Sequence, residues 1–91
     1  MSEVSLNRAE RRYELDVDGS VAVAAFRDEA GVRTFTHTVV PEALGGRGVG
    51  SRLIAAALVD TRAAGLRVVP RCSFVAGYID RHPEFHDLLA A

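Results

Sequence analysis

A run with four glycines, Gly45-Gly46-Arg47-Gly48-Val49-Gly50, separates two parts of the chain whose apolar residues follow different periods. Residues 13–40 have the alternation and β-branched content of strands, and Pro41 closes the last strand because proline cannot donate to a sheet ladder. Residues 49–64 have apolar side chains at helical spacing. A glycine-rich turn between a strand and a helix gathers backbone N–H groups at the positive end of the helix dipole. This junction therefore predicts an anion-binding turn.

The segment before the turn predicts an antiparallel meander of three strands. Residues 13–17 alternate apolar and acidic side chains, and Asp18-Gly19 supplies the chemistry of a tight hairpin turn. Two further β-rich runs, residues 20–27 and 32–40, are separated by a break at residues 28–31. The first ten residues show no clear period, and they are either a tail or a short edge strand around residues 4–6.

The segment after the turn predicts a helix, a strand and two short helices. The helix ends near Ala64 with Gly65 as its cap, and residues 66–70 form a buried strand parallel to the strand before the helix. Ser73 is predicted to cap a further helix, and Pro83 precedes a last helical turn at residues 84–89. The predicted fold class is α/β (α+β), an antiparallel meander followed by a strand–loop–helix–strand crossover, in a single domain of residues 1–91.

Composition removes several classes of function. Hydrophobic residues make up 48% and charged residues 25% of the 91 positions, which is typical of one globular domain rather than a disordered chain. Eleven arginines, with no lysine, face 12 acidic residues for a net charge of −1, so we expect neither nucleic acid nor membrane as a partner. The lone Cys72 excludes an internal disulfide, and the N-terminus lacks the pattern of a signal peptide. These features predict a cytoplasmic protein, and they leave its oligomeric state open.

Two common phosphate loops do not fit the glycine run. A Walker A loop requires Gly-Lys-Ser/Thr, whereas Ser51-Arg52 follows Gly50. A dinucleotide-binding fingerprint requires a third glycine at the position of Ser51. The run instead resembles the pyrophosphate loop of the GCN5-related N-acetyltransferases, Gln/Arg-x-x-Gly-x-Gly/Ala, because Gly48-Val49-Gly50 matches its core. The Gln/Arg position falls on Gly45, so Arg47 becomes the predicted cationic contact to phosphate.

A second resemblance extends over about residues 10–90. The segments that carry it are His37-Thr38, the Pro41 loop, Val69-Pro70-x-Cys72-x-Phe74-Val75 and Tyr78-Ile79-x-Arg81-His82-Pro83-Glu84-Phe85. Together they resemble the small YjdJ-type, or NATD1-like, acetyltransferases, which have a truncated, minimal GCN5-related fold. The resemblance implies acetyl-CoA as co-substrate and an amine acceptor, either a small amine or a protein lysine. It implies cofactor binding by Val39, Val40, Gly45, Gly46, Arg47, Gly48, Val49, Gly50, Ser51 and Ser73.

Three side chains are candidates for catalysis. Acetyl transfer to an amine needs a base, a donor for the oxyanion and an acid for the leaving thiolate. Cys72 precedes a predicted helix start, where its thiol pKa would fall, and the resemblance makes the matching cysteine catalytic. His37 lies on the strand that enters the glycine turn and is a candidate base. Tyr78 is a candidate acid. Each has a structural alternative, as a buried thiol, a hydrogen-bonded strand histidine and a core tyrosine respectively.

The sequence also allows interpretations other than an acetyltransferase. His82 and His86 have the i, i+4 spacing of a metal pair, but Pro83 interrupts the helix between them, so we expect no metal and interpret His82 as a helix cap. A CoA-binding or acyl-CoA-binding module without catalysis is the main alternative function. A domain that binds some other anion in the glycine turn is a third possibility.

Overall fold

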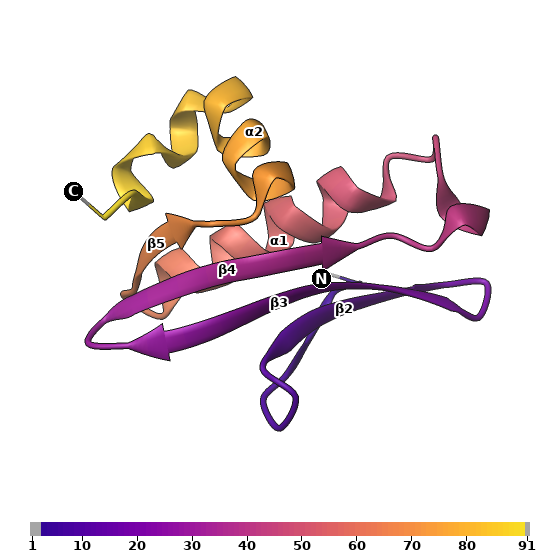
Figure 1. The fold of residues 1–91 in the computed structure, drawn as a ribbon, viewed down its shortest axis with the longest axis horizontal. Helices are drawn as coiled ribbons and strands as arrows, with labels where there is room; N and C mark the ends of the chain where they lie inside the picture. Colours follow the sequence, from indigo (N-terminus) through magenta and orange to yellow (C-terminus); the bar gives the residue numbers. More distant parts are fainter. Residues whose placement is uncertain (1–2, 91) are drawn as a thin grey trace.

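The computed structural model describes residues 3–90, so both ends of the predicted domain, residues 1–2 and 91, lie outside the described part (Figure 1). Within residues 3–90 the elements follow in this order: β1 (Ser5–Asn7), β2 (Arg12–Val17), β3 (Ser20–Glu29), β4 (Val32–Val39), η1 (Glu42–Leu44), α1 (Val49–Ala63), β5 (Arg67–Pro70), α2 (Ser73–Arg81) and η2 (Pro83–Leu88). The strands form one mixed sheet in the order β1-β2-β3-β4-β5. The predicted fold class is confirmed.

Two tight turns fold the first part of the chain into the antiparallel meander. Asp18 and Gly19 join β2 to β3 with φ angles of 53° and 85°. Ala30 and Gly31 join β3 to β4 with φ angles of 52° and 79°. Two consecutive left-handed residues are the pattern of type I′ hairpins, whose twist matches that of the strands they connect. The break predicted at residues 28–31 is therefore shorter than expected, because β3 continues through Glu29.

The N-terminal residues that the sequence left open form an edge strand. β1 pairs antiparallel with β2, with Leu6 opposite Tyr13. Of the two alternatives for this segment, the short edge strand is the observed one, at Ser5–Asn7 rather than residues 4–6.

Helix α1 covers one face of the sheet, as its apolar spacing predicts. Its buried residues include Leu53, Ile54, Ala57, Leu58 and Thr61, the residues at helical spacing in the sequence. Gly65, with φ of 75°, follows the helix, and its N–H donates to the carbonyl of Arg62 at 3.0 Å. In Figure 1, α1 runs behind β4, and it contacts β2, β3 and β5. None of the helices within residues 3–90 is long and apolar enough to cross a bilayer.

A β-bulge in β4 changes which side chains face α1. Ala25 pairs with His37 whereas Phe26 pairs with Phe35, so Thr36 is an extra residue in β4. Because cross-strand partners share a face, Phe35 lies with the buried Phe26 on the face covered by α1. His37 lies with Ala25 on the opposite, open face.

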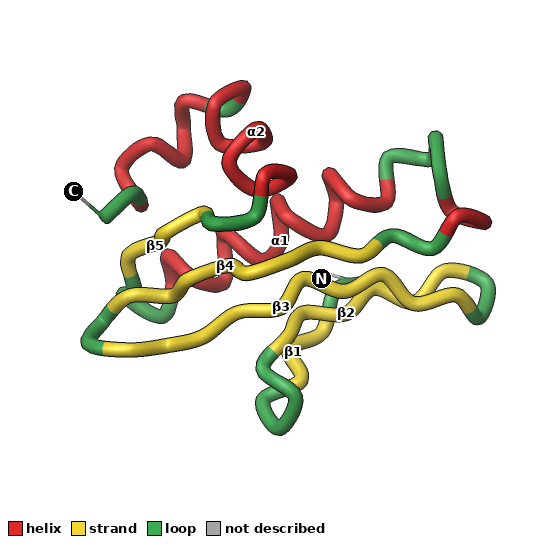
Figure 2. Tube along the Cα trace, in the orientation of Figure 1, coloured by secondary structure: helices red, strands yellow, loops and turns green. Residues whose placement is uncertain are grey.

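Strand β5 returns parallel to β4, as predicted for the crossover. The pairing runs from Val32 opposite Arg67 to Phe35 opposite Pro70 and ends there. Figure 2 shows the two strands side by side over this short stretch, while β4 continues toward the loop that leads into α1. Among residues 3–90, no strand pairs with residues 36–40 on the β5 side. We call this interval the β4–β5 gap.

The chain closes with α2 and η2, which pack beside β4 and β5. The N-cap of α2 is Cys72, and Ser73 is the first helical residue. The prediction that Ser73 caps this helix is therefore wrong by one residue. At the other end, His82 Nδ1 lies 2.7 Å from the carbonyl oxygen of Tyr78, which agrees with its interpretation as a helix cap. His86 Nε2 lies 3.0 Å from the carbonyl oxygen of Ile79.

Candidate active site

The glycine run forms a turn that only glycine adopts without strain. Gly46 and Gly48 have φ angles of 76° and 70°, in the left-handed region. Gly48 is the N-cap of α1, and its carbonyl accepts the first helical hydrogen bond, from the N–H of Arg52 at 3.1 Å. The turn thus directs the chain from the end of β4 into the first turn of a 15-residue helix.

The start of α1 presents unused hydrogen-bond donors. No acceptor within residues 3–90 is recorded for the backbone N–H groups of Val49, Gly50 and Ser51, which precede the first helical hydrogen bond. These donors lie at the positive end of the helix dipole. A phosphate-type anion is the ligand that such a set of N–H groups favours.

A pocket of about 310 Å³ opens over these donors. Its walls are made by Val40, Leu44, Gly45, Gly46, Gly48, Val49, Gly50, Ser51 and Phe74. We call it the glycine pocket. Most residues that were predicted to hold the cofactor meet there, and its volume suits part of an extended ligand rather than a whole one.

Three residues predicted for the cofactor do not line the glycine pocket. Val39 is 51% exposed and, as the partner of Val23, lies on the open face of the sheet. Arg47 lies 3.4 Å from a carboxylate oxygen of Asp18 in the β2–β3 turn, with both side chains exposed. Ser73 is exposed at the start of α2. The cationic contact predicted for Arg47 therefore requires it to leave Asp18, and it stays a prediction.

Phe74 is a wall of the pocket that the sequence analysis did not assign. Its ring lies against the first turn of α1, where a Cβ on Gly50 would come within 2.6 Å of Phe74 Cζ. The ring remains 38% exposed. The sequence did contain a signal for this role of Phe74. It is an apolar residue near the predicted start of a helix, two positions after the candidate cysteine. Gly50 therefore allows the close packing of Phe74 on α1 as well as access to the backbone.

The β4–β5 gap leads from the end of the β4–β5 pairing to the glycine pocket. The carbonyl oxygen of Phe35 accepts hydrogen bonds from the N–H groups of Arg71 and Cys72, at 3.1 and 3.0 Å, and these bonds end the contact between the strands. Beyond this point the edge of β4 runs unpaired to Val40, which is itself part of the pocket wall. The pocket and the gap are therefore continuous along β4.

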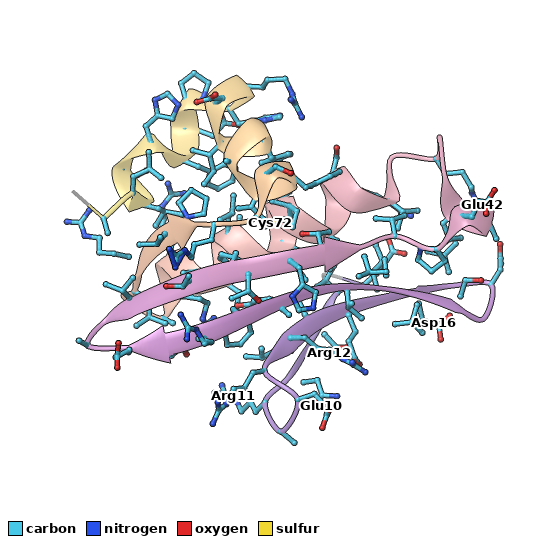
Figure 3. All side chains as sticks on the ribbon, viewed as in Figure 1. Glu10, Arg11, Arg12, Asp16, Glu42 and Cys72 are labelled. Atoms are coloured by element: carbon cyan, nitrogen blue, oxygen red, sulfur yellow. The ribbon has the colours of Figure 1, made fainter. Side chains whose placement is uncertain are left out.

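Cys72 lies in this gap, at the N-cap of α2 (Figure 3). Its Sγ lies 3.4 Å from Oγ1 of Thr38 on β4. Burial raises the pKa of the thiol, but the Thr38 hydroxyl and backbone N–H groups at the start of α2, those of Val75 and Phe74, outweigh this effect and lower the pKa below its ordinary value. Thr38, adjacent to the candidate His37, is the partner that the sequence analysis missed.

His37 does not accompany Cys72. The bulge at Thr36 places the exposed imidazole on the open face, whereas Thr38 and the thiol lie toward the helices. Its Nδ1 lies 3.2 Å from Oγ1 of Thr36. The structure thus puts the candidate base and the candidate thiol on different faces of the sheet.

Tyr78 is part of the hydrophobic core. Its ring is 6% exposed, stacks on His82 at a centroid distance of 3.8 Å and contacts Phe85 at 6.0 Å. Burial, and secondarily the charge of Glu84, raise the pKa of its hydroxyl. Of the alternatives weighed for this residue, the contacts favour core packing. Within residues 3–90 no group of three or more His, Cys, Asp or Glu side chains is placed to hold a metal ion.

Comparison with known proteins identifies a family and a similar fold. The model of a family described as GCN5-related N-acetyl-transferase matches residues 12–88. The fold is similar to the solution structure of a GCN5-like protein from Staphylococcus aureus, described as a candidate N-acetyltransferase, with a TM-score of 0.74 and 24% identity. That match covers 100% of this chain and 92% of the other. No curated protein sequence matches the chain significantly.

Proposed function

Because this chain belongs to the GCN5-related N-acetyltransferase family, we propose that it transfers the acetyl group of acetyl-CoA to an amine. The observation that carries the proposal is the alignment of three features along β4. Val40 lies in the wall of the glycine pocket, and it is the last residue of the unpaired edge. Cys72 contacts Thr38, which lies on the same edge two residues before Val40. Two residues of strand span roughly 7 Å, so one extended ligand can reach from the pocket to the thiol.

Three parts of acetyl-CoA have a matching surface: the pyrophosphate, the pantetheine arm and the thioester. The pyrophosphate lies on the N–H groups of Val49, Gly50 and Ser51, at the start of α1. The pantetheine arm follows residues 36–40 and pairs with the open strand edge as an additional strand would. Phe74 gives this path an apolar wall. The thioester then lies in the β4–β5 gap near Cys72.

The thiol is the catalytic residue that we propose. A neutral amine attacks the thioester carbonyl and the C–S bond breaks. The amine nitrogen loses one proton as the amide forms, and the departing CoA thiolate takes up one proton. A thiol of lowered pKa serves this reaction in one of two ways. It gives its proton to the departing CoA thiolate, or, as thiolate, it accepts the acetyl group and passes it to the amine. We assign no step to His37 or Tyr78, since neither side chain is directed toward this thiol.

Calorimetric titration with acetyl-CoA, with ATP and NAD as controls, tests the binding half of the proposal. Saturable binding of acetyl-CoA alone is the expected result, and equal responses to all three ligands would contradict it. A Cys72→Ala variant is expected to bind acetyl-CoA but not to release CoA in the presence of amines. Turnover at the normal rate in that variant would make the cysteine structural.

A CoA-binding module without catalysis is a second candidate function. It is favoured by Gly45 at the Gln/Arg position of the family loop and by the Arg47–Asp18 ion pair, which together leave the loop without a free cation of its own. Release of CoA that saturates with acetyl-CoA and depends on an added amine separates the enzyme from the module.

Finer aspects of the proposal come from the sequence. We propose that the chain is a small YjdJ-type member of the family and acts as a single domain. We also propose a cytoplasmic location, because a reducing compartment keeps a free thiol such as that of Cys72 in its reduced form. The acceptor is a small amine or a protein lysine, and a panel of both classes in the CoA-release assay would identify it.

A further inference from the structure

A second pocket, of about 330 Å³, lies at the other end of the sheet from the glycine pocket. Its lining residues are Leu6, Arg8, Arg11, Phe26, Asp28 and Arg33. We call it the arginine pocket. It is formed by β1, the β1–β2 turn and the adjacent ends of β3 and β4, and Figure 3 shows Arg11 on that turn. β4 separates Arg33 from Val40 by seven residues, roughly 23 Å, so the two pockets are distinct sites.

Arg33 is a buried cation with a spare donor. The residue is 5% exposed, and its guanidinium lies over the ring of Phe26 at 4.1 Å from the centroid. Nε and Nη2 each donate to Asp28 at 2.7 Å, and Nη1 donates to Tyr13 at 2.6 Å and to Thr61 at 3.5 Å. A guanidinium has five N–H groups, so these four bonds leave one N–H on Nη2 for which residues 3–90 provide no recorded acceptor.

Arg8 and Arg11 add two guanidinium groups that have no recorded acceptor within residues 3–90. The backbone holds both at the rim of the pocket. The N–H of Arg11 donates to the carbonyl of Arg8 at 3.3 Å, and the carbonyl of Arg11 accepts from the N–H of Phe26 at 3.0 Å. Arg11 also adopts a left-handed φ of 53°, which is uncommon for a side chain of this size. The hydrogen bond between Arg11 and Phe26 thus fixes the β1–β2 turn to β3 and keeps both arginines near the pocket.

The charge in this pocket is positive although the whole chain is slightly negative. Three guanidinium groups face the carboxylate of Asp28, which Arg33 already binds twice, and a second carboxylate, that of Asp60, lies 4.0 Å from Nη1 of Arg33 outside the pocket lining. The chain as a whole has a net charge of −1. Planar guanidinium groups match the geometry of phosphate and carboxylate oxygens, and Leu6 and Phe26 add an apolar floor.

We propose that the arginine pocket binds a small oxyanion, a phosphate or a carboxylate group, independently of the acetyl-CoA site. Arg8 and Arg11 contact the oxyanion directly, and Arg33 contributes its remaining N–H from the wall of the pocket. Asp28 and Tyr13 hold Arg33 in place.

Titration of the full chain, followed by two-dimensional ¹H–¹⁵N NMR of backbone amides and arginine Nε–H groups, tests the proposal. Inorganic phosphate and malonate are added in separate arms, and sodium chloride keeps the ionic strength constant. We expect saturable shifts at residues 6–11 and 26–33 in at least one arm, and the arm that saturates identifies the group. Arg8→Gln and Arg11→Gln are each expected to weaken binding about tenfold, because each removes a charge-assisted hydrogen bond.

Arg27→Gln is the matched control, since Arg27 is exposed on β3 and does not line the pocket. Its affinity is expected to equal that of the unchanged protein. Both tested arginines are exposed, so their variants keep the fold, and unchanged spectra outside the turn verify this. The proposal is overturned by shifts that stay linear in both arms, by shifts confined to residues 45–51, or by equal losses in Arg27→Gln and Arg8→Gln.

Discussion

The contact between Gly50 and Phe74 predicts that Gly50→Ala lowers the stability of the unchanged protein but raises the stability of a Phe74→Ala variant. Gly50 occupies the second position of α1 in ordinary helical geometry, so alanine there stabilises the helix by about 0.5–1 kcal/mol. The added Cβ, however, would lie 2.6 Å from Cζ and 3.1 Å from Cε2 of Phe74. Overpacking of this kind costs about 1–3 kcal/mol. The exposed part of the ring can swing outward, which places the cost near the lower end of that range.

The two effects predict that Gly50→Ala destabilises the protein by about 0.5 kcal/mol. In a Phe74→Ala background the overlap is absent, and Gly50→Ala is expected to stabilise by about 0.5–1 kcal/mol. The double-mutant cycle then gives a coupling of roughly 1–1.5 kcal/mol between the two positions. Urea unfolding followed by circular dichroism measures all four variants. Equal effects of Gly50→Ala in both backgrounds would refute the close approach of the ring to α1.

Three further predictions concern the glycine turn, the thiol and the buried polar network. Gly48→Ala, at a φ of 70°, is expected to weaken acetyl-CoA binding in calorimetry by at least tenfold, whereas Gly31→Ala, at a φ of 79° in the β3–β4 turn, carries the same strain without that loss. The rate at which iodoacetamide alkylates Cys72 is expected to reach half its maximum at a pH below that typical of free cysteine. Thr38→Val is expected to raise this midpoint pH, because the Thr38 hydroxyl lowers the pKa of the thiol. Tyr13→Phe is expected to cost about 1–3 kcal/mol in urea unfolding, because the Tyr13 hydroxyl donates to Asp60 and accepts from Arg33.

The last of these substitutions also has a pH signature. Burial, and secondarily the hydrogen bond to Asp60, raise the pKa of Tyr13 from 10.0 to about 12. A raised pKa in the folded state gives stability that is present below pH 10 and is lost as the pH rises toward about 12. Urea unfolding at pH 9 and pH 11 should show this loss in the unchanged protein and a smaller one in Tyr13→Phe.

Each of the grouped predictions has a contrary outcome. Equal losses of acetyl-CoA affinity in Gly48→Ala and Gly31→Ala would mean that backbone strain, and not a change in the glycine pocket, causes the loss. If Thr38→Val left the midpoint pH of alkylation unchanged, the Thr38 hydroxyl would have no effect on the pKa of the Cys72 thiol. A Tyr13→Phe variant as stable as the unchanged protein would mean that its hydroxyl adds nothing to the network around Arg33.

The order of elements was predictable because each was specified locally. Asp18-Gly19 is a turn wherever two strands flank it, and the apolar spacing of α1 identifies its buried face without any tertiary information. The glycine run likewise predicts donors at a helix start, whatever the rest of the fold. These parts of the structure depend on residues that are close together in the sequence.

The directions of the candidate side chains depend on contacts that the sequence does not display. Simple alternation along β4 would group His37 with Phe35, but the extra Thr36 moves the histidine to the other face. Cys72 rather than Ser73 caps α2, because Phe35 accepts hydrogen bonds from both Arg71 and Cys72 and so fixes where the extended chain ends. Pairings between strands distant in the sequence decide both outcomes.

The β4–β5 gap bears on how the protein behaves when no ligand is bound. A sheet ordinarily has unpaired edges only at its two outer strands, but residues 36–40 form a further edge within this sheet, since no strand among residues 3–90 pairs with them on the β5 side. An unpaired edge is a template for strand addition from another chain, and hence for aggregation. If acetyl-CoA occupies this edge, light scattering on heating should show less aggregation with acetyl-CoA than with ATP. The surface proposed to hold the cofactor would then also be a surface that the cofactor shields from other copies of the chain.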